Sequence, residues 1–217
     1  MYKDKKCVIV LSGGLDSSTV AYWAKSQGYQ IYPIVFKYGQ IAVKEVYAAK
    51  KIAENLGTSI KIVDFSALKD IFQTSSLVNR DIALSGEFSE AIIVPFRNAI
   101  FLSVAVAYAA TVGANEIFYG AHDSDVAFYP DCRRDFYEAF EKAAQLGTNS
   151  NISISAPYMG KEKTDLVKAA TKLNVPLELT WSCYTDGEQH CGQCESCINR
   201  KKAFQKANIA DLTKYEY

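Results

Sequence analysis

The chain has no excess of charge of either sign. Its 217 residues include 24 lysines and arginines and 24 aspartates and glutamates, which gives a formal net charge of zero. A neutral chain is not expected to bind nucleic acid or anionic membrane through bulk electrostatic attraction. A local basic patch is still compatible with this balance, and the run Arg200-Lys201-Lys202 is the candidate for one.

Long apolar runs, internal repeats and low-complexity segments are also lacking. No stretch approaches the roughly 20 apolar residues that a helix needs to span a bilayer. The apolar stretch that follows residues 1–6 ends in a glycine loop at Gly13 and is too short for a secretory signal. These absences predict a cytoplasmic protein with no membrane partner.

The hydrophobic fraction of 49% is ample for the core of one domain. Strand-like stretches at 7–11, 31–36, 60–65, 116–120 and 152–156 alternate with helical spacing at 16–25, 41–56, 99–111, 134–146 and 163–173. This alternation predicts an α/β fold, a Rossmann-like parallel sheet with helices on both faces. Pro33 favours a non-central position or a bulge for the second strand. We expect residues 1–178 to form this domain and residues 179–217 a small cysteine-rich segment.

Residues 66–96 interrupt the alternation of strands and helices. A short helix is predicted at 67–72, and the stretch 73–94 is polar and only weakly periodic. Long irregular excursions inside a compact domain usually have a functional role or are mobile. We interpret this one as a lid or substrate loop rather than as a passive insertion.

The first predicted strand leads into a glycine turn and a helix start, in the run Ser12-Gly13-Gly14-Leu15-Asp16-Ser17-Ser18. Glycines let the backbone approach an anion, and the free N–H groups of a helix N-terminus favour negative charge. The run lacks the third glycine of G-x-G-x-x-G and the Gly-Lys-Ser/Thr of a Walker loop. By itself it fits a phosphate site and a tight turn with serine caps equally well.

Four cysteines lie close together near the end of the chain: Cys183, Cys191, Cys194 and Cys197. The C-x-x-C spacing lets two thiolates reach one ion, and two further thiolates complete a tetrahedron, which favours a structural Zn²⁺. An iron–sulfur cluster and redox disulfides are the alternatives. A fifth cysteine, Cys132, would need a nearby base to act as a nucleophile, and His122 is the only candidate; we favour a non-catalytic role for Cys132.

Together these stretches resemble a known family. The run from Ser12 to Ser17 resembles the pyrophosphate loop (PP-loop) of the ATP-pyrophosphatase superfamily. Further stretches resemble the 7-cyano-7-deazaguanine synthase (QueC) family: Tyr38-Gly39-Gln40, Arg97-Asn98, Asp125 with Tyr129-Pro130-Asp131-Cys132-Arg133, and Ser182-Cys183-Tyr184 with the three following cysteines. The resemblance covers nearly the whole chain in order. It implies an adenine nucleotide alpha hydrolase-like domain that binds ATP.

The resemblance also implies a reaction. Members of the family convert 7-carboxy-7-deazaguanine and ammonia to the nitrile 7-cyano-7-deazaguanine, in queuosine and archaeosine biosynthesis. The expected cofactors are ATP, structural Zn²⁺ and Mg²⁺ beside ATP, and the expected assembly is a homodimer. A carboxylate becomes reactive toward ammonia once ATP has adenylated it, and the pyrophosphate that leaves must be stabilised as its charge develops.

The resemblance places roles on individual residues. The expected catalytic residues are Asp16, Arg97 and Lys163, and ATP is expected to bind Leu11, Ser12, Gly13, Gly14, Leu15, Asp16, Ser17, Ser18 and Lys163. Substrate binding is expected at Tyr38, Gln40, Arg97, Asn98, Asp125, Tyr129, Asp131 and Arg133. Carboxylates can accept from a guanine-like N–H edge, arginine suits the 7-carboxylate, and Tyr129 or Phe128 can stack on the base. Helix capping and loop bracing are the alternative roles for the charged residues of this group.

Three stretches depart from the family pattern. Ile41-Ala42 stands where Arg-His is usual, Phe96 where a small residue is common, and the run before Asp125 begins with an unusual His122. These departures keep two alternatives open. One is a QueC-like paralogue that stops at the amide, or couples a deazaguanine to a macromolecule such as a protein, as in antiphage systems. The other is a zinc-bearing nucleotide- or tRNA-binding module without turnover, which would use Arg200-Lys201-Lys202; the zero net charge and the intact Asp/Ser loop count against it.

Overall fold

The core of the molecule is a parallel sheet. The computed structural model describes residues 5–217; residues 1–4, which enter the prediction of no secretory signal, lie outside the described part. Five strands pair in the order β3-β2-β1-β4-β5, and every pairing is parallel. Their bounds are β1 (Lys6–Val10), β2 (Gln30–Lys37), β3 (Lys61–Asp64), β4 (Glu116–Phe118) and β5 (Ser153–Ser155).

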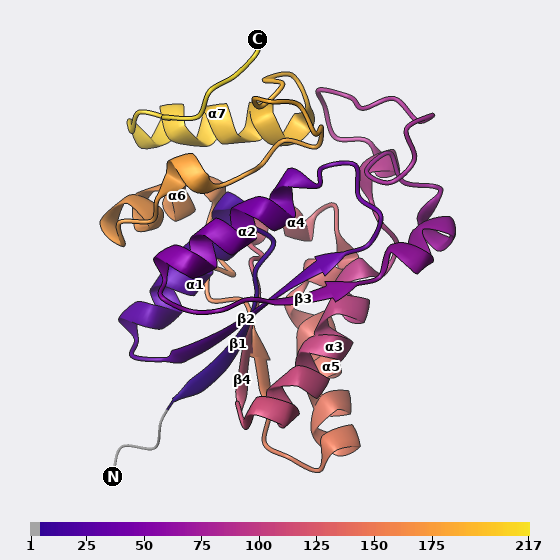
Figure 1. Cartoon of the computed structure of the whole chain (residues 1–217), viewed down its shortest axis with the longest axis vertical. Helices are drawn as coiled ribbons and strands as arrows, with labels where there is room; N and C mark the ends of the chain where they lie inside the picture. Colours follow the sequence, from indigo (N-terminus) through magenta and orange to yellow (C-terminus); the bar gives the residue numbers. More distant parts are fainter. Residues whose placement is uncertain (1–4) are drawn as a thin grey trace.

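Helices cover both faces of this sheet, as Figure 1 shows. They are α1 (Leu15–Ser26), α2 (Lys44–Asn55), α3 (Arg97–Val112), α4 (Asp123–Val126), α5 (Arg134–Thr148), α6 (Lys163–Lys172) and α7 (Glu195–Ala207). One apolar core joins α1 and α2 to the sheet, and a second core joins α3 and α5 to its other face. The predicted fold class, a Rossmann-like parallel sheet with helices on both faces, is confirmed.

The strand order reverses at the centre of the sheet. The chain runs from β1 outward to β3, crosses over through α3, and continues from β4 to β5. Loops that leave the carboxyl ends of β1 and β4 therefore diverge to opposite sides, and in open α/β sheets the crevice at such a point binds ligands. The glycine loop follows β1 and the His122 loop follows β4, so both candidate stretches open into this crevice.

Pro33 lies in a non-central strand, as predicted, because β1 and not β2 is at the centre of the sheet. Pro33 pairs with Ile9 in an interior strand, because β2 lies between β1 and β3. The ladder to β3 begins one residue later, at Ile34 opposite Lys61. A proline has no N–H to donate to a neighbouring strand. At Pro33 the strand has a partner on one side, which explains why an interior strand accepts it.

The crossover helix α3 is apolar around most of its circumference. The stretch Glu90–Val112 is long and apolar enough to cross a membrane by length and composition alone. Its packing accounts for that composition, because Leu102, Ala105 and Ala109 of α3 are buried against β1, β2 and β4. The helix begins at Arg97, after Phe96, which adopts a left-handed conformation with φ 57°.

The irregular segment before α3 is packed rather than open. It contains two 3₁₀ turns, Ser66–Phe72 and Glu90–Ile92, and a small core of its own formed by Phe72, Leu77, Val78, Ile92 and Val94 around Tyr38. The backbone N–H of Ser76 donates to the carbonyl oxygen of Ala91 (2.7 Å), which closes the segment on itself. The predicted short helix is thus a 3₁₀ turn, and the lid or substrate role stays a prediction.

The C-terminal helix packs on the domain through an apolar patch and a buried charge. Leu15, which follows the glycine loop, shares a core with Val167, Ala203 and Phe204. Arg200 is fully buried; it donates to the hydroxyl of Thr180 (2.7 Å) and pairs with Asp211 (3.3 Å). The interpretation of Arg200-Lys201-Lys202 as an exposed basic contact is therefore wrong for Arg200, whose charge is used inside the protein.

Candidate functional site

The glycine loop is held in place by close packing and by its own serines. A Cβ at Gly13 (φ +86°) would lie 2.5 Å from the backbone nitrogen of Ala49, and still closer to the carbonyl oxygen of Glu45. Gly13 thus lets α2 pack directly on the loop. The hydroxyls of Ser12 and Ser17 lie 2.9 Å apart, and Ser17 Oγ accepts from the Ser12 N–H (3.2 Å). The loop is preorganised ahead of the N-terminus of α1, where anions are favoured.

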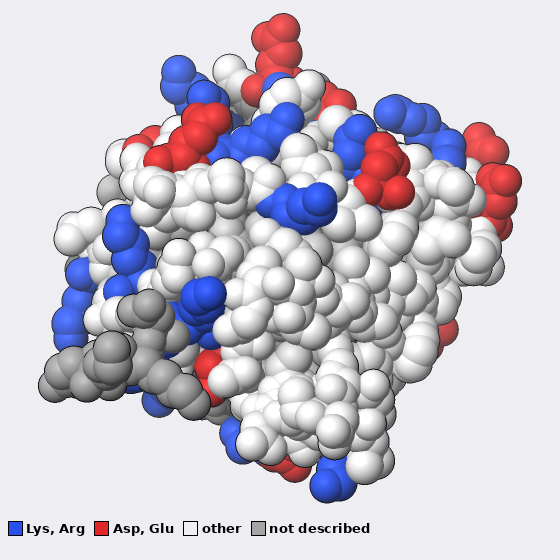
Figure 2. All heavy atoms as spheres, turned by 60° about the horizontal axis from the view of Figure 1, so that its bottom comes forward, with Lys and Arg blue, Asp and Glu red and all other residues white. Residues whose placement is uncertain are grey.

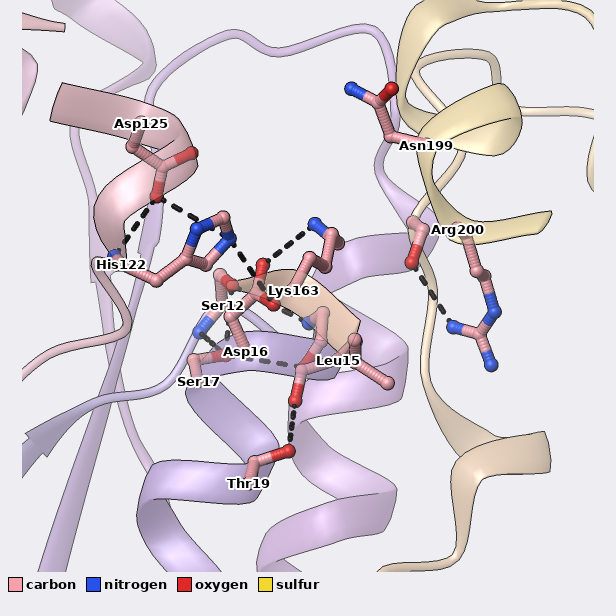
Figure 3. A network of polar contacts seen from close by, with 12 residues as sticks. Ser12, Leu15, Asp16, Ser17, Thr19, His122, Asp125, Lys163, Asn199 and Arg200 are labelled. Carbon is pink, nitrogen blue, oxygen red and sulfur yellow. Dashed lines mark hydrogen bonds and ion pairs between the residues drawn. The ribbon is translucent and has the colours of Figure 1, made fainter. Parts of the chain in front are cut away.

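A charged network lies beside the loop (Figure 3). Lys163, at the start of α6, places its Nζ 3.0 Å from Oδ2 of Asp16. Burial alone would raise the pKa of Asp16, but the charges of Lys163 and His122 outweigh it and lower that pKa. Burial would in turn lower the pKa of Lys163, and the carboxylates of Asp16 and Asp125 raise it instead. Both groups are therefore charged at neutral pH.

His122 is a residue that the sequence analysis did not include in the ATP site. Its side chain is 2% exposed, and its Nε2 lies 3.7 Å from Oδ1 of Asp16 and 3.6 Å from Oδ2 of Asp125. Within the described residues, neither ring nitrogen of His122 nor Oδ1 of Asp16 has a hydrogen-bond partner. Burial raises the pKa of Asp125. The network thus keeps polar atoms next to the phosphate loop that make ion-pair contacts but no hydrogen bond.

The loop forms one end of a cavity of about 240 Å³. Most of the predicted site residues line it: Leu11, Ser12, Gly14, Leu15, Asp16, Ser17, Tyr38, Gln40, Arg97, Asn98, Asp125, Tyr129, Asp131 and Lys163. A second hollow of about 280 Å³ shares Asp125, Tyr129 and Lys163 with it and reaches Lys202 on α7. Residues far apart in the chain therefore converge on one site at the carboxyl edge of the sheet.

Two predicted residues point elsewhere. Ser18 is fully buried in α1 and does not line the cavity, so its hydroxyl is not placed to bind phosphate. Arg133 is exposed, and its Nε donates to the carbonyl oxygen of Val126 (3.1 Å). Neither residue lines the cavity. Gly13 contributes through its close packing rather than as part of the cavity wall.

Arg97 stands at the end of the cavity that is formed by α3 and the end of β2. Its guanidinium donates to the hydroxyl of Tyr38 (2.9 Å). Burial would lower the pKa of Arg97, but Tyr38, Glu45 and Asp131 raise it, so the cation persists. Gln40 is fixed beside it, because its side chain accepts from the Tyr38 N–H (2.9 Å) and donates to the Phe36 carbonyl oxygen (3.1 Å).

Glu45 is a second residue that the sequence analysis missed. It lies in the first turn of α2, and its carboxylate lines the cavity together with Arg97. Burial raises the pKa of Glu45 to about 7, although Arg97 and a hydrogen bond from Gln40 oppose that rise. A carboxyl group poised near neutral pH in a cavity is typical of functional sites.

The Tyr-Pro-Asp-Cys-Arg stretch braces the start of α3. Oδ2 of Asp131 accepts from the backbone N–H of Asn98 (2.9 Å), and the Asn98 side chain donates to Sγ of Cys132 (3.2 Å). Asp131 thus has a helix-capping role in addition to its place in the cavity wall. Burial, with Asp125 and Asp131 nearby, raises the pKa of the Cys132 thiol. The thiol stays protonated, which agrees with a non-catalytic Cys132.

The four C-terminal cysteines form one cluster. The sulfur atoms of Cys183, Cys191, Cys194 and Cys197 all lie within 4.8 Å of one another. Backbone N–H groups point at them: that of Cys191 donates to Sγ of Cys183 (3.3 Å), and that of Cys194 to Sγ of Cys191 (3.3 Å). Hydrogen bonds from the neighbouring thiols lower the pKa of Cys183. This donor set is compatible with a tetrahedral Zn²⁺ ion.

Comparison with known proteins gives one family over almost the whole chain. Residues 6–208 match the sequence model of the queuosine biosynthesis protein QueC. A 7-cyano-7-deazaguanine synthase of Thermoplasma volcanium is 44% identical over 97% of this chain and 91% of its own length. One of Oceanobacillus iheyensis is also 44% identical, over 97% of this chain and 98% of its own length.

Solved structures agree on the fold at low sequence identity. A 4-thiouridine synthetase in complex with RNA and ATP is 17% identical and superposes with a TM-score of 0.55, over 94% of this chain and 50% of that one. NMN synthetase from Francisella tularensis is 15% identical, with a TM-score of 0.54 over 97% of this chain and 80% of that one. At these identities the likeness concerns the fold alone.

Proposed function

This chain belongs to the family of the queuosine biosynthesis protein QueC, and on that premise we propose that it converts 7-carboxy-7-deazaguanine and ammonia to 7-cyano-7-deazaguanine at the expense of ATP. A carboxylate is a poor electrophile, so it is first joined to AMP, and pyrophosphate leaves. Ammonia then displaces AMP to give the amide. A second ATP activates the amide oxygen, and departure of AMP leaves the nitrile.

One observation carries this proposal: a single cavity runs from the glycine loop to Arg97. At the loop end, the backbone N–H groups around Gly14 and the ammonium of Lys163 bind the departing pyrophosphate, whose charge they stabilise. Asp16 holds Lys163 in position. Its Oδ1, which accepts no hydrogen bond, fits a hard cation such as Mg²⁺, which would neutralise phosphate charge when bound.

The other end of the cavity is suited to the deazaguanine acid. Arg97 is the cation that we assign to the 7-carboxylate, in place of Arg133, because Arg97 lines the cavity and Arg133 does not. Asp125 can accept hydrogen bonds from the guanine-like edge of the substrate. Tyr129 stands in the same wall and offers an aromatic face for the base.

Two of the three departures from the family pattern lie away from this cavity, whereas the third, at His122, contacts Asp16 and Asp125 beside it. Ile41, Ala42 and Phe96 do not line it, and Phe96 is 64% exposed. Their positions therefore favour the nitrile-forming enzyme over a paralogue with another acceptor. The hypothesis of a binding module is weakened in a separate way, since Arg200 of its basic contact is buried against Asp211.

The proposal is tested by incubating the purified protein with ATP, ammonium and 7-carboxy-7-deazaguanine, and by measuring product masses. We expect the nitrile, with two AMP and two pyrophosphate released for each nitrile formed. Accumulation of the amide, or of a macromolecular adduct, would support the paralogue instead. Nucleotide binding without acid-dependent release of pyrophosphate would support the binding module.

We further propose that the cysteine cluster holds a structural Zn²⁺ and thereby stabilises residues 179–217 against the ATP-binding domain 1–178. Four thiolates close the coordination sphere of the ion, which leaves no position for substrate. The cluster also lies next to the active cavity, because Ser182 and Tyr184 line that cavity. A bound ion would thus fix one wall of the site.

The deazaguanine acid and ammonia are both small and water-soluble, which supports a cytoplasmic location.

A homodimer is the assembly that we propose. Figure 2, turned so that the lower part of Figure 1 comes forward, shows a broad area without charged side chains. Helix α3 has one charged residue, Arg97, and exposes small residues such as Ser103, Ala107 and Ala110. Small residues let a second copy of this helix approach closely. Ala107→Glu should therefore yield a monomer in light scattering, whereas Ser26→Glu, on α1 at the other face of the sheet, should leave a dimer.

A further inference from the structure

Glu45 is an acidic group in the cavity whose role in the reaction is not yet assigned. The contact of α2 with Gly13 fixes the backbone of Glu45 beside the phosphate loop. Among the described residues, none forms a salt bridge with Glu45. Its carboxylate, which accepts a hydrogen bond from Gln40, thus keeps the capacity to bind a cation that enters the cavity.

The groups that face Glu45 come from three parts of the fold. Arg97 of α3 attracts the carboxylate, Gln40 at the end of β2 donates a hydrogen bond to it, and Cys183 of the cysteine cluster repels it. Tyr38 lies in the same environment, because the charge of Glu45 contributes to raising the pKa of the Tyr38 hydroxyl. Burial makes Glu45 more basic than an exposed glutamate. A carboxylate of this kind accepts a proton effectively near neutral pH.

The proposed function, on which this inference rests, needs such a group. At neutral pH ammonia is present mostly as ammonium, which has no lone pair and cannot attack the acyl carbon. The cavity must therefore bind the ion, remove a proton and hold the resulting ammonia beside the adenylated carboxyl group. Arg97, assigned to the substrate carboxylate, lines the same cavity as Glu45 and is close enough to attract its carboxylate, so nucleophile and electrophile would meet there.

We propose that the carboxylate of Glu45 binds the ammonium ion and accepts its proton, so that ammonia is released at the acyl carbon. The N–H bond of ammonium breaks and the proton moves to a carboxylate oxygen of Glu45. The nitrogen lone pair forms the C–N bond, and the C–O bond to AMP breaks, with the electron pair leaving on AMP. The extra proton on the new amide nitrogen passes to the phosphate of the departing AMP. Glu45 returns its proton to solvent before the next turnover.

The test separates the adenylation of the acid from its amination. Glu45→Gln keeps the shape of the side chain and removes the base. In a single turnover, we expect acid-dependent release of pyrophosphate to stay within about 3-fold of the wild type, while amide formation from ammonium falls about 100-fold or more. Higher pH should restore part of that rate in the variant, because free ammonia becomes more abundant.

Hydroxylamine supplies the decisive comparison, because it is a neutral nucleophile at neutral pH and needs no base before it attacks. Glu45→Gln should form the hydroxamate at close to the wild-type rate, which also shows that the variant is folded. Glu54→Gln, an exposed position on the same helix, should behave as wild type in all three assays.

Several results would overturn the inference. If Glu45→Gln loses hydroxamate and amide formation to the same extent, Glu45 supports the architecture of the site and is not the base. If it loses neither, another group receives the proton. If the wild type releases no pyrophosphate in response to the acid, the proposed function fails and this inference fails with it. The first two results leave the proposed function standing.

Discussion

Nζ of Lys163 lies 3.0 Å from Oδ2 of Asp16, although the two residues are 147 positions apart in the chain. The pair ties the start of α6 to the phosphate loop after β1. Each charge offsets the cost of burying the other, which is why both remain ionised in a largely buried place. Loss of one partner should therefore affect the other as well as the ligand that they bind.

Asp16→Asn is expected to abolish most of the adenylation activity. The substitution keeps the size of the side chain but removes the charge that positions Lys163. We expect acid-dependent pyrophosphate release to fall about 100-fold or more, the loss typical of a group that stabilises charge in a transition state. Asp70→Asn, at an exposed position, is the control and should leave the rate unchanged. Near-normal release by Asp16→Asn would refute the assignment of the loop.

Gly13→Ala should damage ATP binding, and Gly28→Ala should not. Both glycines have positive φ, +86° and +80°, so alanine costs about 1 kcal/mol of backbone strain at either position. A Cβ at Gly28 would meet nothing within 4 Å, whereas at Gly13 it would collide with α2. We expect ATP affinity, measured by calorimetry, to drop at least tenfold for Gly13→Ala alone. Equal behaviour of the two variants would contradict the close packing of loop and helix.

Asp211→Asn should destabilise the C-terminal segment in a pH-dependent way. Arg200 is fully buried, and removal of its partner charge should cost about 3 kcal/mol in the free energy of unfolding at pH 7. Burial alone would raise the pKa of Asp211, but Arg200 and hydrogen bonds from Tyr215 and Thr213 lower it below its ordinary value of 3.8.

The sign of the pH effect follows from that lowered pKa. The stabilisation by Asp211 is fully present above pH 3.8 and is lost as the pH falls through the lower value of the folded state. The difference between wild type and Asp211→Asn, measured by urea unfolding, should therefore shrink below about pH 4. A difference that stays constant down to pH 3 would mean that the pair does not stabilise the fold through charge.

Removal of the metal should lower the affinity of the protein for ATP. We expect about one zinc per chain in purified protein, and its loss in Cys197→Ser. Because α7 packs on Leu15 next to the phosphate loop, zinc loss should weaken ATP binding as well as lower the melting temperature. Cys7→Ser, in β1, should keep its zinc. A brown protein that contains iron would favour an iron–sulfur cluster. A protein purified without metal would refute the proposed zinc site.

The fold could be predicted because each of its helices and strands is indicated by residues that are contiguous in the sequence. Alternating apolar strands and helical spacing, closed by glycines, indicate βαβ units whatever the rest of the chain does. Ser12 to Ser17 could likewise be recognised, since the turn and the helix start are contiguous. The four cysteines were identifiable for the same reason, because their spacing already brings the thiols within reach of one ion.

Features that depend on long-range contacts could not be predicted in this way. Glu45 stands in an amphipathic helix, where an acid normally faces water, and its place in the cavity wall depends on how α2 packs against the loop after β1. Arg200 stands in a basic run that indicates an exposed surface, and its burial depends on Asp211, which follows the end of α7. Arg133 is two positions from Asp131, yet Asp131 accepts from Asn98 at the start of α3 whereas Arg133 donates to the carbonyl oxygen of Val126.

The short outer strands of the sheet have a consequence for the behaviour of the protein at high concentration. An open sheet has two borders, here β3 and β5, and a free border can recruit a strand from another molecule. Strand β3 spans Lys61–Asp64, begins and ends with a charged residue, and is tied to β2 by the pair Lys37–Asp64 (3.2 Å). Strand β5 spans only Ser153–Ser155. Edge strands this short and polar offer few backbone groups for pairing with a strand of another molecule. The protein should therefore resist aggregation at high concentration.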